Sequence, residues 1–333
     1  MRRLRLLGTF ATVMAVLLSG CATAPKPATS ASSPGVPAIT FGLTYTPDVQ
    51  FAPIYVAEQQ GYFAAQGLNV TLRHHGASES LFGALQAGTE QVVFAGGDEM
   101  MVARGQGVGV VDFATIYQTY PVVLIVPASS PITSLADLKG HTIGVPGPYG
   151  ETWYSLLAML QQAGLRQDQV DIQNIGYTQY AALASNKVDA VVGYVNNDLV
   201  RFQQGAVPVR SLPLDPSTAP LIGVGLGATD DLVTNHPETL KALWRAVNQG
   251  MQFCIDHPDQ AVAISASYVP NLNQPDARGA ALATLRATTL LYGNTFGHQD
   301  AARWTAMSEF LAAQGLTAKA VPAEQVFSTS VVG

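Results

Sequence analysis

Six short segments of the chain are candidates for a binding site, at residues 45–51, 96–99, 117–120, 149–153, 177–180 and 194–198. All but the segment at 96–99 carry aromatic side chains that could recognise a flat ring, and each of those five contains tyrosine. The aromatic candidates are Tyr45, Phe51, Tyr117, Tyr149, Trp153, Tyr177 and Tyr194. Aromatic rings stack on one another with offset geometry, which contributes about 0.5–1.5 kcal/mol per pair beyond burial. These segments therefore predict a site for a planar heteroaromatic ligand. For any one of the tyrosines the alternative is ordinary packing at the rim of a domain.

The polar side chains in the same segments are neutral or acidic, and none of the six segments holds Arg or Lys. The polar candidates are Asp48, Gln50, Asp98, Glu99, Gln118, Glu151, Thr152, Asn196 and Asn197. An anionic ligand would normally call for a bidentate arginine, although helix N-termini alone can hold anions. Acidic acceptors suit ligand donors such as ribityl hydroxyls, an imide N–H or the amines of an aminopyrimidine. Asp98, Glu99 and Glu151 have an alternative role at helix starts, where acids offset the helix dipole.

Residue patterns for catalysis or metal binding are weak. His74 and His75 are adjacent on an expected strand, so they point to opposite faces and are expected to be solvated rather than to share an ion. The GVPG stretch at 144–147 is not a dinucleotide fingerprint, because it lacks the third glycine and the acidic residue on a following strand. No Ser-His-Asp or Cys-His order indicates a nucleophile. We therefore expect neither an enzyme nor a metal or cofactor.

Strands and helices alternate over the first two thirds of the chain. Expected strands cover residues 39–45, 70–75, 91–95, 110–117, 122–127, 141–145, 171–175, 190–194 and 207–212, and expected helices cover 52–65, 78–86, 100–104, 153–163 and 180–185, with another from 196. This repetition predicts α/β units whose mostly parallel sheets have helices on both faces. The six candidate segments follow strands, and the carboxyl ends of strands are where such sheets bind ligands.

The last third of the chain begins with an apolar, glycine-rich strand at 221–228 and is then largely helical, at 237–254 with Asn235 as its cap, 259–266, 277–291 and 300–314. A second α/β unit is therefore inserted into the first, with crossings at 118–122 and 213–221. We expect a two-lobed clamshell with a two-strand hinge. Lobe 1 comprises residues 38–120 and 215–333, and lobe 2 residues 121–214. Ligand binds between such lobes and closure buries it.

The N-terminus has the order of an export signal. Arg2, Arg3 and Arg5 precede an apolar stretch at 6–18 that is short for a membrane span, and small residues then lead to Cys21. This order resembles a bacterial lipobox and predicts a signal peptide at 1–20, lipid on Cys21 and a flexible tether at 21–37, rich in Ala, Pro and Ser. The protein would then be anchored to the cell membrane, facing outside. The alternative is an ordinary signal peptide with Cys21 near the cleavage site.

Composition bounds the class of protein. The chain has 333 residues, of which 48% are hydrophobic and 12% charged, so it can bury about two domain cores. Its net charge of −6 argues against a nucleic-acid partner. With Cys21 lipidated, Cys254 has no disulfide partner and is expected to be a small buried hydrophobe.

Three stretches resemble the type II periplasmic solute-binding proteins of ABC importers. They are FAPIYVAEQQGYFAAQGLNV at 51–70, LADLKGHTIGVP at 135–146 and NHPETLKALWRAVNQGMQFC at 235–254, and the resemblance covers residues 39–330. More narrowly the chain resembles the branch that binds thiamine pyrimidine precursors, riboflavin or sulfonates. Gly96-Gly97-Asp98-Glu99 with the following MMVARGQG is most similar to the riboflavin-binding members. The resemblance implies a receptor that captures riboflavin and delivers it to an ABC permease and its ATPase. The tether at 21–37 suits a monomer, and nothing in the sequence calls for an oligomer.

Two other interpretations remain beside riboflavin capture. The first is binding of an aminopyrimidine thiamine precursor by the same kind of receptor. The second is an enzyme similar to the pyrimidine synthases, which would need a Schiff-base lysine for pyridoxal phosphate. The yeast-type synthases carry a CCCFC motif that is absent here, and Lys139, Lys187, Lys241 and Lys319 all lie outside the six segments. A sensor domain of the same shape is a further alternative.

Overall fold

The computed structural model describes residues 38–332 apart from 77–78, 206 and 216–218. The expected signal peptide at 1–20, the lipidation site Cys21 and the tether at 21–37 lie outside the described residues. Within the described part, no helix has the length and apolar character needed to cross a membrane.

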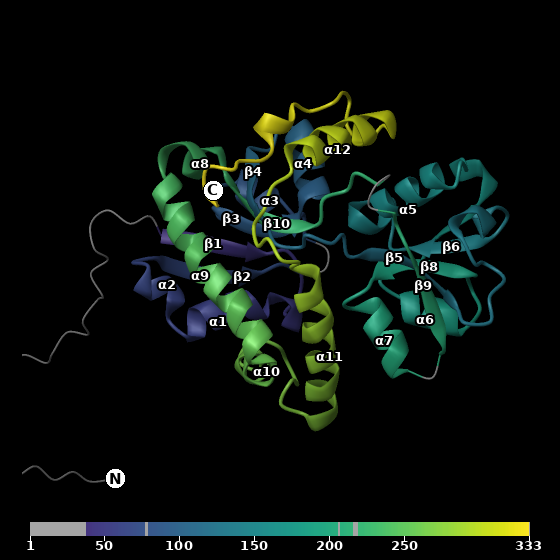
Figure 1. The fold of residues 1–333 in the computed structure, drawn as a ribbon, viewed down its shortest axis with the longest axis horizontal. Helices are drawn as coiled ribbons and strands as arrows, with labels where there is room; N and C mark the ends of the chain where they lie inside the picture. The colour runs from purple at the N-terminus through teal and green to yellow at the C-terminus, as the bar shows by residue number, and fades with distance from the viewer. Residues whose placement is uncertain (1–37, 77–78, 206, 216–218, 333) are drawn as a thin grey trace, which may run out of the picture. The chain divides into compact units, whose positions relative to one another are not determined.

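The first sheet has five strands in the order β2-β1-β3-β10-β4. They span β1 Ala38–Leu43, β2 Asn69–His74, β3 Val92–Gly96, β4 Val110–Thr115 and β10 Val224–Thr229. β1 pairs in parallel with β2 and β3, whereas β10 lies antiparallel between β3 and β4. Figure 1 shows green β10 beside the purple and blue strands, so a late segment completes a sheet begun at the N-terminal end.

The second sheet repeats this pattern in the order β7-β6-β8-β5-β9. Its strands are β5 Val122–Pro127, β6 Thr142–Val145, β7 Asp171–Asn174, β8 Ala190–Tyr194 and β9 Val209–Pro213. β6 is parallel to β7 and β8, and β5 is antiparallel to β8 and β9. Each sheet has one strand that runs antiparallel to its neighbours, β10 in the first sheet and β5 in the second. Each of these strands is the first that the chain forms after it leaves the other sheet. The predicted two-lobed α/β fold with mostly parallel strands is confirmed.

Two of the expected helices are interrupted or shortened. The stretch 52–65 forms α1 Ala52–Gln59 and α2 Tyr62–Ala65, because Gly61 between them has a φ of 72°, a left-handed conformation that glycine adopts readily. The expected helix at 78–86 is reduced to α3 Gly83–Gln86. α6 Gln179–Ala184 and α7 Asp198–Gln204 lie close to their predicted positions.

Two helices that follow strands begin three residues earlier than expected. α4 spans Gly97–Gly105 directly after β3, and α5 spans Gly150–Gln162 shortly after β6. Their glycines are typical of turns, but the acids that follow them belong to the first helical turn, where unpaired N–H groups favour carboxylates. Asp98, Glu99 and Glu151 therefore project from helix starts rather than from loops.

The C-terminal helices are α8 Asp230–Asn235, α9 Pro237–Asp256, α10 Pro258–Ser265, α11 Pro275–Leu291 and α12 Ala301–Ala313. α8 was not predicted, although the Thr229 side chain accepts a hydrogen bond from the Leu232 amide and caps it. The prediction that Asn235 caps the long helix is wrong. Asn235 ends α8, and α9 starts after His236 with Pro237 at its first position.

Short 3-10 helices complete the described structure, η1 Val49–Phe51, η2 Leu135–Leu138, η3 Gln167–Gln169 and η4 Ala323–Gln325. Cys254 on α9 is fully buried among apolar side chains, which confirms its predicted role as a small hydrophobe. Burial also raises the pKa of its thiol.

Candidate functional site

Three carboxylates from the starts of two helices meet beside the end of β3, and we call them the acidic cluster: Asp98 and Glu99 from α4, and Glu151 from α5. Asp98 is fully buried and Glu151 is 3% exposed. Both lie against the Cα of Gly96, where an added Cβ would be 2.6 Å from Asp98 Oδ1 and 2.9 Å from Glu151 Oε1. Glycine at 96 leaves the space in which these two carboxylates converge.

The hydrogen bonds of the cluster leave one acceptor free. Asp98 Oδ2 accepts from the Tyr120 hydroxyl at 2.6 Å, and Oδ1 accepts from the Glu99 amide at 2.7 Å. Glu151 Oε2 accepts from the Tyr194 hydroxyl at 2.6 Å. Glu151 Oε1 is buried and has no hydrogen-bond partner among the described residues. A ligand donor would supply the hydrogen bond that this oxygen lacks.

Glu99 contacts both helix starts. Its Oε2 accepts from the Gly96 amide at 3.0 Å, which closes a capping box at the start of α4. The backbone amide of Glu151, in the first turn of α5, lies near the Glu99 carboxylate and lowers its pKa, which partly offsets the effect of burial. In agreement with this contact, a Cβ at Gly150 would lie 3.2 Å from Glu99 Oε1.

Burial makes the cluster retain protons. It raises the pKa of Glu99 to about 7. Burial raises the pKa of Asp98 and Glu151 well above the ordinary carboxyl range, and repulsion from neighbouring carboxylates adds to each shift. Among the described residues, none of the ion pairs includes these three side chains. The cluster therefore lacks a cationic partner and suits a ligand group that donates hydrogen bonds.

Tyrosines surround the cluster. Tyr120, Tyr154 and Tyr194 are packed against it, and burial together with the nearby carboxylates raises the pKa of each phenol. Tyr120 also donates to the Glu151 carbonyl at 3.2 Å, so it joins the two helix starts through Asp98 and Glu151.

A second aromatic group lies at the ends of β1 and β7. The rings of Tyr45 and Tyr177 are 6.3 Å apart at 61°, an edge-to-face pair between loops of different sheets. Tyr177 is 51% exposed and Tyr149 is 52% exposed, so both can still contact a ligand. The structure thus brings together three of the predicted aromatic residues.

Two other predicted aromatics are already covered by protein. Phe51 is 1% exposed and packs edge-to-face on Tyr55, His74 and Phe94. Tyr117 is 2% exposed and its ring stacks on Tyr292. Neighbouring side chains cover both rings, so neither ring offers an open face to a ligand.

Some of the remaining predicted polar residues form hydrogen bonds within the protein, and the others are buried or half-buried. Gln118 Nε2 donates to the carbonyl oxygens of Thr115 at 2.7 Å and His298 at 3.1 Å. Asp48 Oδ1 accepts from the Gln50 amide and caps η1, and burial raises the pKa of Asp48. Asn196 Nδ2 donates to Thr288 Oγ1 of α11 at 2.9 Å, while the buried Asn196 Oδ1 has no partner among the described residues. Gln50 and Asn197 are half-buried, Thr152 is buried, and Trp153 packs partly against the core.

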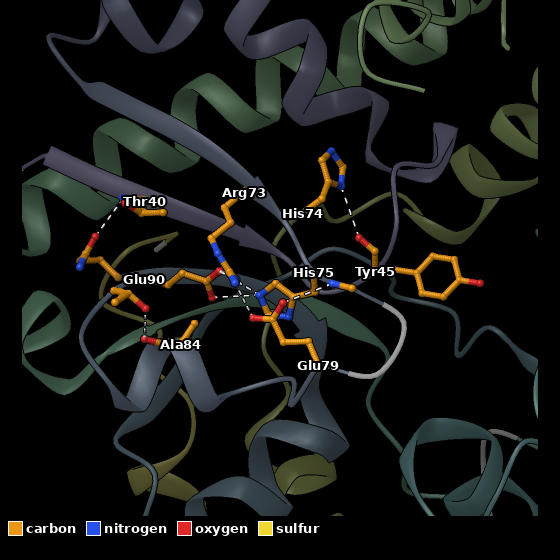
Figure 2. Close-up of polar contacts among 11 residues, drawn as sticks. Thr40, Tyr45, Arg73, His74, His75, Glu79, Ala84 and Glu90 are labelled. Atoms are coloured by element: carbon orange, nitrogen blue, oxygen red, sulfur yellow. Dashed lines mark hydrogen bonds and ion pairs between the residues drawn. The ribbon is translucent and has the colours of Figure 1, made fainter. Parts of the chain in front are cut away.

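The two adjacent histidines lie on opposite sides of β2, as predicted, but His75 is not solvated (Figure 2). His75 is 2% exposed and its Nε2 lies 2.9 Å from Glu90 Oε1. Arg73 Nη1 binds the same Glu90 oxygen at 2.6 Å, and Arg73 Nη2 binds Glu79. The prediction of solvation is wrong here because the fully buried Glu90 gives His75 a partner, in space that Gly42 leaves open. The described residues include no group of three side chains that could ligate a metal.

Some residues of the site were not singled out from the sequence. Tyr120 stands in one of the six segments and Tyr154 follows another, and tyrosine near a strand end was the available signal for both. Thr288 is 92 residues from its partner Asn196 on a different lobe, and no local pattern points to it.

The two sheets and the site between their strand ends define a periplasmic-binding-protein fold. The structure is similar to that of the periplasmic aliphatic sulphonate binding protein SsuA from Escherichia coli, with a TM-score of 0.71 at 17% identity over 86% of this chain and 91% of that one. Residues 48–261 match the family described as NMT1/THI5 like. The chain belongs to this NMT1/THI5-like family.

Two relatives refine this placement. The chain is 33% identical to the riboflavin-binding protein RibY of Chloroflexus aurantiacus, over all of this chain and 99% of the relative. It is 26% identical to a formylaminopyrimidine-binding protein of Halalkalibacterium halodurans, over 86% of this chain and 88% of the relative. The predicted resemblance to riboflavin-binding members of a solute-binding family is confirmed.

Proposed function

We propose that the protein is the solute receptor of an ABC importer and that it captures riboflavin between its two lobes. The observation that carries this proposal is the combination, at one place, of accessible tyrosine rings and a buried free acceptor, Glu151 Oε1. The isoalloxazine ring system offers a flat aromatic face and an imide N–H, and the ribityl chain offers hydroxyl donors. Full-length similarity to a protein named for riboflavin binding supports this choice of ligand.

Each lobe supplies part of the site, which suits capture by closure. Asp98, Glu99 and Tyr45 follow strands of the first sheet, whereas Glu151 and Tyr177 follow strands of the second. We place the lobe boundaries at 120/121 and 214/215, where the chain crosses between sheets. Ligand favours the closed state only to the extent that it binds that state more tightly than the open one.

Polar and aromatic contacts join the two lobes. They include the Tyr45–Tyr177 ring pair and the Asn196–Thr288 hydrogen bond. In this proposal a bound ring separates the two tyrosines and stacks on one or both of them. Closure then presents the ligated form to a permease and its ATPase, with the chain held at the membrane through lipid on Cys21.

Flavin fluorescence tests the proposal directly, because stacking on tyrosine and exclusion from water change the emission of riboflavin. We expect saturable quenching at one riboflavin per chain when the full chain is titrated into dilute riboflavin. An absence of quenching and of any shift in unfolding temperature would contradict riboflavin as the ligand.

A second candidate ligand is an aminopyrimidine precursor of thiamine. The acidic cluster favours it specifically, because ring amines of such a compound would donate to carboxylates that lack a cationic partner among the described residues. Competition decides between the two: the proposal predicts that radiolabelled riboflavin is displaced by unlabelled riboflavin but not by an equal concentration of formylaminopyrimidine. Displacement by the pyrimidine alone would reverse the choice.

A further inference from the structure

We propose that Glu99 is a charge-selectivity residue that occupies the two helix N-termini at the site and thereby excludes anionic ligands, while Glu151 Oε1 receives a ligand donor. This inference deepens the proposed function, since it takes the region between the lobes as the ligand site. It concerns the charge of the ligand rather than its exact identity.

Helix N-termini are ready-made anion sites, because their first N–H groups lack partners within the helix. The start of α4 has no such group left for a ligand. Gly97 and Asp98 amides donate to the carbonyl oxygens of Gly223 at 3.0 Å and Ile222 at 3.4 Å. The Gly96 amide donates to Glu99 Oε2 at 3.0 Å.

The fourth amide of this set, that of Glu99, donates to Asp98 Oδ1 at 2.7 Å. Every N–H from Gly96 to Glu99 is thus satisfied by the chain itself. α4 has nine residues and α5 has thirteen, so both are long enough for their N-termini to attract negative charge.

Glu99 reaches the start of the second helix as well. Gly150 is the first residue of α5, and a Cβ added there would lie 3.2 Å from Glu99 Oε1. One side chain from lobe 1 therefore fills the place between two helix starts that a sulfonate or carboxylate group would take. An incoming anion would have to displace this carboxylate from its contacts at the two helix starts.

A separate observation indicates what the site accepts instead. Glu151 Oε1 is buried and unpartnered among the described residues, although Glu151 as a whole is only 3% exposed. A buried acceptor without a donor is unfavourable unless a ligand supplies one. The cluster is therefore arranged to take an N–H or O–H group and to reject an anion.

Removing Glu99 tests the exclusion. The full chain and its Glu99→Ala variant are titrated calorimetrically with ethanesulfonate and, separately, with riboflavin. We expect the wild type to show no ethanesulfonate binding at millimolar concentration, and Glu99→Ala to gain at least a tenfold higher affinity. Glu99→Gln keeps the shape of the side chain and removes its charge, so we expect a smaller gain in ethanesulfonate affinity. If circular dichroism shows that Glu99→Ala is unfolded, Glu99→Gln provides the test.

Glu309→Ala is the matched control, because Glu309 is an exposed acid on α12 with no hydrogen bond or ion pair among the described residues. It should bind ethanesulfonate no better than the wild type. The proposal is overturned if neither Glu99 variant gains affinity, if the wild type already binds ethanesulfonate as tightly as Glu99→Ala, or if Glu309→Ala gains equally.

Riboflavin titration of the wild type separates this proposal from the proposed function. A gain of sulfonate binding without any riboflavin binding supports charge exclusion and removes riboflavin as the ligand. Riboflavin binding without a gain in the folded Glu99 variants removes charge exclusion and leaves the proposed function in place.

Discussion

At the scale of single residues, the three carboxylates of the acidic cluster have different roles because their oxygens have different partners. Both oxygens of Asp98 already accept hydrogen bonds, one from Tyr120 and one from Glu99. Glu99 accepts a hydrogen bond from the Gly96 amide at the start of α4, and its other oxygen lies beside Gly150 at the start of α5. Of the three, Glu151 keeps a buried oxygen without a partner among the described residues. The three acids look equivalent in the sequence, and it is the hydrogen bonds that distinguish them.

Glu151→Gln should therefore weaken riboflavin binding. An amide has one acceptor where a carboxylate has two, and the Tyr194 hydroxyl already takes one of them. The variant then turns an NH₂ group toward the ligand donor. We expect a loss of about 10- to 100-fold in affinity, since hydrogen bonds to charged groups contribute about 1.5–3 kcal/mol. Fluorescence titration measures it.

Asp98→Asn provides the comparison for this variant. Because both Asp98 oxygens are occupied within the protein, its effect on ligand affinity should be smaller than that of Glu151→Gln. Glu309→Gln should leave affinity unchanged. An equal or larger loss for Asp98→Asn would transfer the ligand contact to Asp98.

The residue types of the site could be predicted from the sequence, but their neighbours could not. Tyr45, Tyr149, Tyr177, Glu99 and Glu151 were expected at strand ends, and the structure brings them to two adjoining clusters. Phe51 and Tyr117 satisfy the same local pattern, yet they are 1% and 2% exposed. Burial depends on segments distant in the chain, such as the Tyr292 ring that covers Tyr117, and local periodicity carries no information about them.

At the scale of elements, strands were predicted more accurately than the starts of helices. Continuous apolar runs located β5 at 122–127 and β8 at 190–194 to the residue. α4 and α5 start with glycine followed by acids, a pattern shared by turns and helix N-termini. Tertiary contacts select the helix here, since the Gly97 amide bonds the Gly223 carbonyl of the segment leading to β10.

The packing of α9 on α1 depends on one glycine. A Cβ at Gly250 would lie 2.0 Å from the Pro53 carbonyl oxygen and 2.9 Å from its carbonyl carbon, and both are backbone atoms that cannot rotate away. We expect Gly250→Ala to lower the free energy of unfolding by about 1–3 kcal/mol, as overpacked core sites do. Urea unfolding followed by circular dichroism measures this.

Gly279 of α11 is the matched control for this substitution. It is also helical, but a Cβ added there would have no atom within 4 Å among the described neighbours. Gly279→Ala should raise the free energy of unfolding by up to about 1 kcal/mol, through helix propensity alone. Equal effects of the two substitutions would show that the α1–α9 contact is not close-packed.

At the scale of the whole molecule, the insertion of one α/β unit into another was predictable because the late apolar strand at 221–228 had no other sheet to join. β10 Val224–Thr229 completes the first sheet in this way. What could not be predicted is how many carboxyls are buried together at the starts of α4 and α5. Asp98 and Glu151 lie on helices that follow strands of different sheets, and the carboxylates of Asp98 and Glu99 add to the effect of burial in raising the pKa of Glu151.

This desolvation predicts that the ligand-free protein loses stability as the pH rises from about 6.5 to 8. Burial raises the pKa of Glu99 and of Asp112 to about 7, and it raises the pKa of Asp98 and Glu151 well above their ordinary values. The folded chain keeps protons that the unfolded chain releases near pH 4, so unfolding releases protons in this window and higher pH favours it. Each proton that the folded chain retains lowers the free energy of unfolding by about 1.4 kcal/mol per pH unit. His74, whose pKa burial lowers, acts with the opposite sign, but only below its ordinary value of 6.5.

Urea unfolding at pH 6.5, 7, 7.5 and 8 measures the slope, and Glu99→Gln identifies its origin. The variant removes one carboxyl that titrates near pH 7 while preserving the shape of the side chain, so its slope should be shallower than that of the wild type. Saturating riboflavin should also reduce the slope, because a donor bound at Glu151 favours the ionised carboxylate and offsets the loss of stability at high pH. Stability that is constant or rises over this range, or an unchanged slope in Glu99→Gln, would show that the acidic cluster does not hold its protons in the folded protein.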